Sequence, residues 1–283
     1  MVVVYFDNRG KYMGLGDLLG KGMTAEVYAW GNDKVLKLFF EDIPKEWIEY
    51  EANIGKEIYE AGISAPAVYS LVSESNRKGI IYQRINGNTM LDILKKKPWS
   101  IVKLALRMAK LQFNVHSLNI ALPLEKDSLA SRINEIRSLS KDKKKSILDY
   151  LDRLPKGEKI CHGDFHPDNL LINNEGTIMI IDWSNTYSGH PLSDVVRTVL
   201  MITTPYMPAG TSRTLVFLSK FLKKLFYSTY VKEYIDLSGV TKEELNSWIL
   251  PVAAARLNEK IPGEEQWLLE IIEKELTRIG FKE

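Results

Sequence analysis

The stretch that decides the fold is CHGDFHPDNLLI, residues 161–172. Its first nine residues include ionisable and amide side chains and its last three are apolar, so the polar groups are expected in a loop that leads into a strand. A second apolar strand over 177–181 follows the turn-forming residues 173–176 and ends at Asp182. The resulting hairpin is expected to bring Asp182 back toward Asn169, so that an amide and a carboxylate converge.

Two interpretations of this stretch compete. In the first, four residues that alternate along the chain line the metal site of a hydrolase: His162, Asp164, His166 and Asp168. Pro167 disfavours a regular strand there, and the sequence contains only two other histidines, which weighs against this interpretation.

The second interpretation is phosphoryl transfer. His162-Gly163-Asp164, four further residues, Asn169 and then Asp182 match the kinase pattern H-R-D-x-x-x-x-N followed by D-F-G at every polar position. This chemistry needs one base that orients the acceptor hydroxyl and oxygen ligands that hold magnesium against the phosphates. We expect Asp164 to be the base, and Asn169 and Asp182 to be the magnesium ligands. With Gly163 in place of the kinase arginine, the motif resembles that of the aminoglycoside phosphotransferase and choline kinase family.

The resemblance extends to a glycine-rich loop near the amino terminus. The sequence GKGMTAEV, residues 20–27, resembles the G-x-G-x-x-G-x-V loop that covers the nucleotide phosphates in kinases. Gly20, Gly22 and Val27 match that pattern, whereas Ala25 replaces the third glycine. Alanine fits there if its φ angle is negative.

A lone lysine follows in the next strand. Lys37 lies in an apolar segment ten residues after Val27 and therefore needs an anionic partner. Glu51 lies on the apolar stripe of an expected helix over 45–61 and is predicted to be that partner. The resemblance implies that Lys37 and Glu51 hold the nucleotide phosphates.

Two further segments resemble the family. Residues 80–87, IIYQRING, resemble the hinge, which implies that the Gln83 carbonyl and the Ile85 amide meet the base and that Tyr82 is the gatekeeper. A bulky gatekeeper leaves ATP and GTP both open as donors. Residues 189–194, GHPLSD, resemble the segment whose aspartate, here Asp194, braces the catalytic loop, with Arg197 as its helical partner.

His162 and His116 are expected to have structural roles. His162 is predicted to order the catalytic loop, and His116 to pack on a helix.

The resemblance implies a two-lobed, protein-kinase-like α+β fold. Residues 1–84 would form a β-rich N-lobe that binds the nucleotide, with a hairpin over 27–40, the helix over 45–61 and a strand over 79–82. Residues 85–283 would form a mainly helical C-lobe with the catalytic loop and the acceptor site. Its expected helices cover 90–96, 100–118, 128–154, 213–234, 242–255 and 264–279.

Composition limits the class of protein and its partners. The 283 residues carry a net charge of +2, 45% are hydrophobic, and Cys161 is the single cysteine, so a disulfide scaffold is excluded and a reducing, cytoplasmic location is expected. The balanced charge argues against a nucleic-acid partner. The apolar run at residues 1–6 is too short for a leader or a membrane span, and lysines interrupt the later apolar stretch over 215–230, so no membrane partner is expected.

The acceptor is expected to be a small molecule with a hydroxyl group. Only 12 residues separate Asp182 from Asp194 (194 minus 182), too few for the activation segment with which a protein kinase binds a peptide. Residues 233–283 carry 11 acidic and 6 basic side chains, a net charge of −5, which suits an aminoglycoside or choline; Arg256 could equally meet an anionic acceptor. A nucleotide-binding pseudokinase and a compact protein-serine kinase remain the alternatives.

Overall fold

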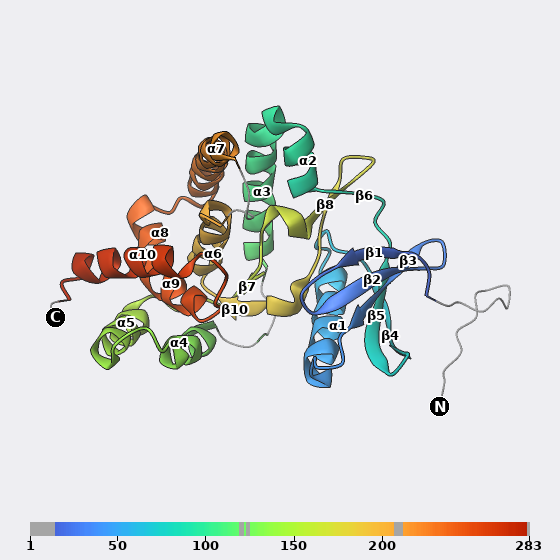
Figure 1. Ribbon diagram of the computed structural model, residues 1–283, viewed down its shortest axis with the longest axis horizontal. Helices are drawn as coiled ribbons and strands as arrows, with labels where there is room; N and C mark the ends of the chain where they lie inside the picture. Colours follow the sequence, from blue (N-terminus) through green and yellow to red (C-terminus); the bar gives the residue numbers. More distant parts are fainter. Residues whose placement is uncertain (1–14, 119–121, 123–124, 207–211, 282–283) are drawn as a thin grey trace. The chain divides into compact units, whose positions relative to one another are not determined.

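A computed structural model of the chain describes residues 15–118, 122, 125–206 and 212–281 (Figure 1). The chain divides into two compact units. The first unit runs up to Met90 and includes residues 168–184, and the second unit contains the remainder. This division differs from the expected single boundary after residue 84, because a later hairpin packs with the first unit.

The first unit contains a five-stranded antiparallel sheet with the strand order β1-β2-β3-β5-β4. Its strands are β1 (Leu18–Lys21), β2 (Ala25–Trp30), β3 (Lys34–Phe39), β4 (Val68–Glu74) and β5 (Arg77–Gln83). The hairpin expected over 27–40 is confirmed as β2 and β3, which turn through Gly31 at a φ of 68°. Buried side chains of these strands, Trp30, Leu36 and Ile81 among them, form a hydrophobic core on the sheet.

One helix packs on this sheet. Helix α1 (Lys45–Glu60) contacts β4 and β5, as Figure 1 shows. Its apolar stripe buries Ile48, Ile54 and Ile58, and Gly62 at a φ of 78° follows its end. The helix expected over 45–61 is therefore confirmed.

A three-stranded sheet completes the first unit, in the order β6-β8-β9. It consists of β6 (Gly87–Thr89), β8 (Leu170–Asn173) and β9 (Ile178–Ile180). Gly87 is required there, because a Cβ atom at this position would lie 2.1 Å from the Ile172 carbonyl oxygen. The Ile180 amide also donates to the Ser64 carbonyl at 2.7 Å. These contacts explain why residues 168–184 belong to the first unit.

The second unit is mainly helical, and β7 (Lys159–Cys161) and β10 (Tyr187–Gly189) form its small two-stranded sheet. Helices α3 and α7 lie side by side in Figure 1 and contact each other. The helices, with α2 starting at the end of the first unit, are α2 (Met90–Lys96), α3 (Ile101–His116), α4 (Glu125–Glu135), α5 (Lys141–Arg153), α6 (Pro191–Thr203), α7 (Arg213–Ser238), α8 (Lys242–Ser247), α9 (Ile249–Leu257) and α10 (Glu265–Arg278).

Two expected helices are wrong, because each is interrupted. The segment 128–154 divides into α4 and α5, and the Ser140 hydroxyl accepts from the Lys143 amide at 3.3 Å and caps the start of α5. The segment 242–255 divides at Trp248 into α8 and α9, and Pro251 lies in the first turn of α9, where its missing N–H costs no helical hydrogen bond.

Among the described residues, none of the helices combines the length and the apolarity that a bilayer span requires. The apolar run at residues 1–6 lies outside the described part of the chain.

Candidate active site

A half-buried lysine with two carboxylate partners lies in the first unit. The Lys37 ammonium on β3 is 2.7 Å from Glu51 Oε1 on α1 and 3.0 Å from Asp182 Oδ1 after β9. Burial alone would lower the pKa of Lys37, but Glu51 and Asp182 outweigh it and raise that pKa to about 12. Lys37 therefore stays protonated, and the pairing with Glu51 expected from the sequence is present.

The surroundings fix both carboxylates. Glu51 is 2% exposed, and the Tyr82 hydroxyl donates to its Oε1 at 2.8 Å. Burial raises the pKa of Glu51, and Lys37 opposes that effect. Asp182 keeps 37% of its side chain exposed and has a φ of 62°, a left-handed conformation that is uncommon outside glycine and is often found at functional sites. The Ser184 hydroxyl donates to Asp182 at 2.9 Å.

Asn169 lies next to this aspartate in the hairpin. The Ile181 amide donates to the Asn169 carbonyl at 3.0 Å, so the backbone brings Asn169 beside the residue that precedes Asp182. The Asn169 side chain is 8% exposed. The predicted return of Asp182 toward Asn169 through the β8–β9 hairpin is therefore confirmed for the backbone.

The glycine-rich loop joins β1 to β2. The Gly22 amide donates to the Ala25 carbonyl at 2.9 Å, and Val27 pairs with Lys37 in the register of β2 and β3. A Cβ atom at Gly20 would meet nothing within 4 Å, so the fold itself does not require glycine there. Ala25 is buried in β2 outside the positive-φ region, so alanine is accommodated at the position of the third glycine.

The end of β5 and the segment after it contain the expected hinge residues. The Gln83 amide donates to the Ala67 carbonyl at 2.9 Å, and the Ala67 amide donates to the Gln83 side chain at 3.3 Å. Ile85 follows the strand and is half-buried. Tyr82 uses its hydroxyl on Glu51, which ties the expected gatekeeper to the lysine pair.

The second unit contains Asp164 and most of the loop that the sequence predicts to be catalytic. His162 is buried and its Nδ1 accepts from the Asp164 amide at 3.1 Å, so His162 contacts the backbone of the loop as expected. The Asp164 carboxylate is 24% exposed and lies 3.4 Å from His166 Nε2. Burial would raise the pKa of Asp164, but His166, Arg197 and His162 together hold it well below its usual range. Asp164 is therefore an ionised carboxylate that solvent can reach.

Asp194 braces this loop, as the sequence predicted. Its carboxylate accepts from the His162 amide at 3.1 Å and from the Gly163 amide at 2.8 Å. Gln112 Nε2 donates to it at 2.9 Å, and His116 Nε2 lies at 3.1 Å. Helix α3 thus supports the loop through Asp194, and the pKa of this fully buried carboxylate is lowered, because burial is outweighed by His116, Gln112 and His162.

The sequence did not reveal the outer part of this network. The Tyr230 hydroxyl donates to Gln112 Oε1, and the Tyr234 hydroxyl lies 2.7 Å from His116 Nδ1. All four side chains are buried. In each pair the residue on α3 and its partner on α7 are 118 residues apart, so the two pairs lie one helical turn from each other. A polar side chain on an otherwise apolar helical stripe was the available signal, but the partner helix could not be identified from it.

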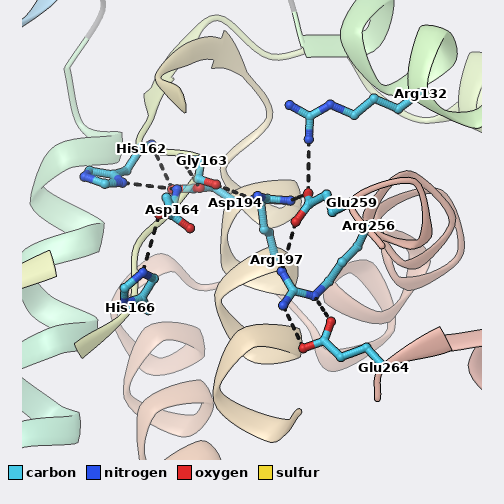
Figure 2. A network of polar contacts seen from close by, with 10 residues as sticks. All are labelled: Arg132, His162, Gly163, Asp164, His166, Asp194, Arg197, Arg256, Glu259 and Glu264. Carbon is cyan, nitrogen blue, oxygen red and sulfur yellow. Dashed lines mark hydrogen bonds and ion pairs between the residues drawn. The ribbon is translucent and has the colours of Figure 1, made fainter. Parts of the chain in front are cut away.

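The predicted pairing of Arg197 with Asp194 is wrong. The Arg197 guanidinium instead donates to the Gly163 carbonyl and to Glu259, as Figure 2 shows. Gly163 has a φ of 75°, and a Cβ atom there would lie 2.2 Å from the Asn185 carbonyl oxygen. The close approach of Asn185 therefore excludes the arginine that kinases have at this position, and Arg197 reaches the same loop from α6.

The low pKa of Asp164 leads to a prediction for pH dependence. A base with a depressed pKa stays ionised, and hence active, above that pKa and loses activity only as the pH falls through it. The variant His166→Gln removes the partner that lowers this pKa most, so we expect the acidic limb of kcat/KM to move to higher pH. The measurement is kcat/KM from about pH 2 to pH 7, a range that extends below the ordinary pKa of a carboxyl group. Superimposable profiles for the variant and the wild type would contradict the assigned effect of His166.

The model of the phosphotransferase enzyme family matches residues 18–213, well over half of the chain. The chain belongs to the phosphotransferase enzyme family. The matched residues of this family member include Lys37 and Glu51, the β8–β9 hairpin and the loop that contains Asp164. A search of curated protein sequences found no match.

Solved structures agree on the kinase-like α+β fold of this phosphotransferase. A thermostable mutant of aminoglycoside phosphotransferase APH(4)-Ia is 16% identical, with 95% of this chain and 97% of that one covered and a TM-score of 0.64. The streptomycin and ATP complex of APH(2")-IIa is 16% identical, with 94% and 92% covered and a TM-score of 0.55. Choline kinase LicA from Streptococcus pneumoniae is 14% identical, with 94% and 92% covered and a TM-score of 0.54. At these identities, the similarity establishes the fold.

Proposed function

We propose that this phosphotransferase is a small-molecule kinase that transfers the γ-phosphoryl group of ATP or GTP to a hydroxyl group. The observation that carries the proposal is the Lys37 ammonium held between Glu51 and Asp182, at 2.7 and 3.0 Å. A lysine in this position is a point charge suited to phosphate oxygens. The exposed Asp182 can release Lys37 when a phosphate takes its place, whereas the buried Glu51 continues to orient it.

The donor set fits magnesium. Lys37, Glu51 and Asp182 together carry a formal charge of −1, which favours a bound cation, and the Asn169 and Asp182 side chains offer the oxygen ligands that magnesium prefers. Bound Mg²⁺ would neutralise charge on the phosphates. Asn169 and Asp182 are the residues that would hold it.

The nucleotide would occupy the first unit. The peptide groups of the loop at Gly20 and Gly22, ahead of Val27, would cover the phosphates. The Gln83 carbonyl and the Ile85 amide would meet the base, with Tyr82 behind them. In support, a homologous-fold structure of APH(4)-Ia is a complex with AMP-PNP and hygromycin B.

Asp164 is the proposed base. Its carboxylate accepts the proton of the acceptor hydroxyl as the hydroxyl oxygen forms a bond to the γ-phosphorus, and the bond between that phosphorus and the β,γ-bridging oxygen breaks to release ADP or GDP. A carboxylate suits this role because the transition state is loose and the base chiefly orients the hydroxyl. Asp194 and His162 hold the loop that positions Asp164.

The acceptor would be a small molecule. The similar folds include a choline kinase and enzymes whose structures contain hygromycin B or streptomycin, which supports a hydroxylated small molecule as acceptor. The buried Cys161 and the nucleotide donor support a cytoplasmic setting.

The test is the release of ADP from ATP, and of GDP from GTP, with a panel of hydroxylated small molecules. We expect an acceptor to stimulate release by at least about tenfold, and removal of Mg²⁺ with EDTA to abolish it. Nucleotide binding without stimulated release by any acceptor would instead indicate a pseudokinase. Transfer to protein substrates alone would indicate a compact protein kinase.

A further inference from the structure

Three arginines gather around one carboxylate beside the catalytic loop. Arg132 on α4, Arg197 on α6 and Arg256 on α9 all contact Glu259, and Arg256 also contacts Glu264 (Figure 2). We call these five residues the arginine cluster. They lie in the second unit, and Arg197 joins them to the Gly163 carbonyl, one residue before Asp164.

Two of the three guanidinium groups have structural partners. Arg256 donates to both oxygens of Glu264, at 2.8 and 2.9 Å, and both residues are buried, so this pair closes the turn after α9. Arg197 is divided between Glu259 and the catalytic loop. The sequence left open whether Arg256 binds an anionic acceptor. Because Glu264 already occupies its guanidinium group, Arg256 is not available for that contact.

Arg132 differs from the other two. Among the described residues it makes one hydrogen bond, from Nη1 to Glu259 Oε1 at 3.2 Å, and Arg197 uses the same oxygen. A guanidinium group has five N–H donors, and the Arg132 side chain is 36% exposed. Arg132 therefore presents donors to solvent next to the loop that contains Asp164.

The surrounding charges do not compensate Arg132. Burial and repulsion by Arg197 lower its pKa, and the attraction of Glu259, Tyr187 and Glu135 does not offset them. Glu135 lies three residues along the same helix, but it is exposed and accepts from Asn258, so water screens it. The five residues of the arginine cluster carry three positive and two negative charges, a net charge of +1. The ionised Asp164 attracts Arg197, so the positive charge that the nearby carboxylates leave uncompensated lies at Arg132. A further anion would thus be stabilised at Arg132.

A small cavity adjoins this guanidinium group. Its volume is about 30 Å³, and Arg132, Arg197 and Tyr187 line it together with the apolar side chains of Leu129, Val252 and Ala255. The cavity has room for about one water-sized group, so it matches a terminal oxyanion and not a sugar ring. Gly163, the residue before Asp164, lines the same cavity.

We propose that Arg132 binds an anionic group, a carboxylate or a phosphate, of the acceptor. This inference rests on the proposed kinase function and narrows its substrate class to a hydroxylated acid or a phosphate ester. An acceptor rich in ammonium groups would meet net positive charge at this point, although the segment 233–283 as a whole is acidic. Two of the acidic side chains in that segment, Glu259 and Glu264, are already bound to arginines.

The test compares acceptors that share one hydroxylated skeleton: glucose, glucuronate, glucose 6-phosphate and glucosamine. We expect kcat/KM for one of the two anionic sugars to exceed that for glucose by at least about tenfold, and the ratio between these two sugars distinguishes carboxylate from phosphate. The variant Arg132→Ala should reduce the preference for the anionic sugar over glucose by about tenfold or more, and Arg132→Lys should recover part of it. The matched control is Arg153→Ala, which changes an exposed arginine on α5 outside the arginine cluster. A preference for glucosamine, or an unchanged ratio in Arg132→Ala, would overturn the proposal.

A binding measurement decides the case in which none of these sugars is a substrate. Titration calorimetry follows inorganic phosphate and acetate binding to the protein loaded with ADP and Mg²⁺, so that the nucleotide site is filled. Saturable binding that weakens at least about tenfold in Arg132→Ala and not in Arg153→Ala supports the anion site, and equal binding by the wild type and Arg132→Ala refutes it. The two hypotheses can fail separately. If the wild type transfers no phosphoryl group to any acceptor, the kinase function is refuted. If the wild type and Arg132→Ala bind the anion equally well, only the proposed role of Arg132 is refuted.

Discussion

The variant Asp164→Asn is expected to lose about 10²- to 10⁴-fold in kcat while its affinity for nucleotide changes little. The asparagine side chain has nearly the same shape as aspartate but cannot accept the hydroxyl proton. Nucleotide affinity should persist because Lys37, Glu51 and Asp182 all belong to the first unit. The measurements are acceptor-stimulated ADP release and ADP binding by calorimetry, with the acceptor that the panel identifies.

The matched control is Asp149→Asn. Asp149 is an exposed carboxylate on α5, where the same change of charge should leave turnover within about twofold of the wild type. If Asp164→Asn kept most of its turnover, Asp164 would not be the base. An equal loss of turnover and of thermal stability would point instead to damage to the loop.

The parts of the site predicted from the sequence are those that local pattern determines. A lysine in an apolar strand and a glutamate on an apolar helical stripe each need a partner, and the sequence offered few, so Lys37 and Glu51 could be paired before the structure was known. The same holds for Asn169 and Asp182, because a short hairpin forces its two ends together. In both cases, burial or chain geometry leaves little choice.

The arginine cluster could not be predicted for the opposite reason. Arg132 and Glu259 are 127 residues apart, and their contact depends on how α4 packs against α9. Arg197 was assigned to Asp194 because a spacing of three on a helix allows contact, but the buried backbone amides of the catalytic loop already use that carboxylate. A helical spacing thus indicates which pairs can form, and the competing donors decide which pair does form.

The helix boundaries show a related limit. Periodicity continued through 136–140, and Ile136 and Leu139 are indeed buried, yet the chain leaves the helix there. Ser140 is a residue type that often caps the start of a helix, but the apolar pattern on both sides of it favoured one continuous helix. Apolar periodicity alone therefore cannot separate one long helix from two helices that bury the same face.

Replacing Lys37 with methionine should reduce kcat/KM by about 10²- to 10³-fold, because a charge contact to the phosphates is lost. It also leaves Glu51 buried without its cation, which costs about 3 to 5 kcal/mol of folding stability when one partner of a buried pair is removed. The matched control is the same change at Lys34, which lies on the same strand as Lys37 and places its ammonium group over the Tyr69 ring of β4. This change should alter turnover by less than about twofold.

The two effects of Lys37→Met can be separated with the double variant Lys37→Met/Glu51→Leu. Replacing both charges with apolar side chains removes the unpaired carboxylate, so thermal unfolding should recover toward that of the wild type. Turnover should stay low, because no cation then faces the phosphates. If turnover instead recovered together with stability, Lys37 would matter only for folding, and the binding of phosphate at this lysine, on which the proposed kinase function depends, would have to be abandoned.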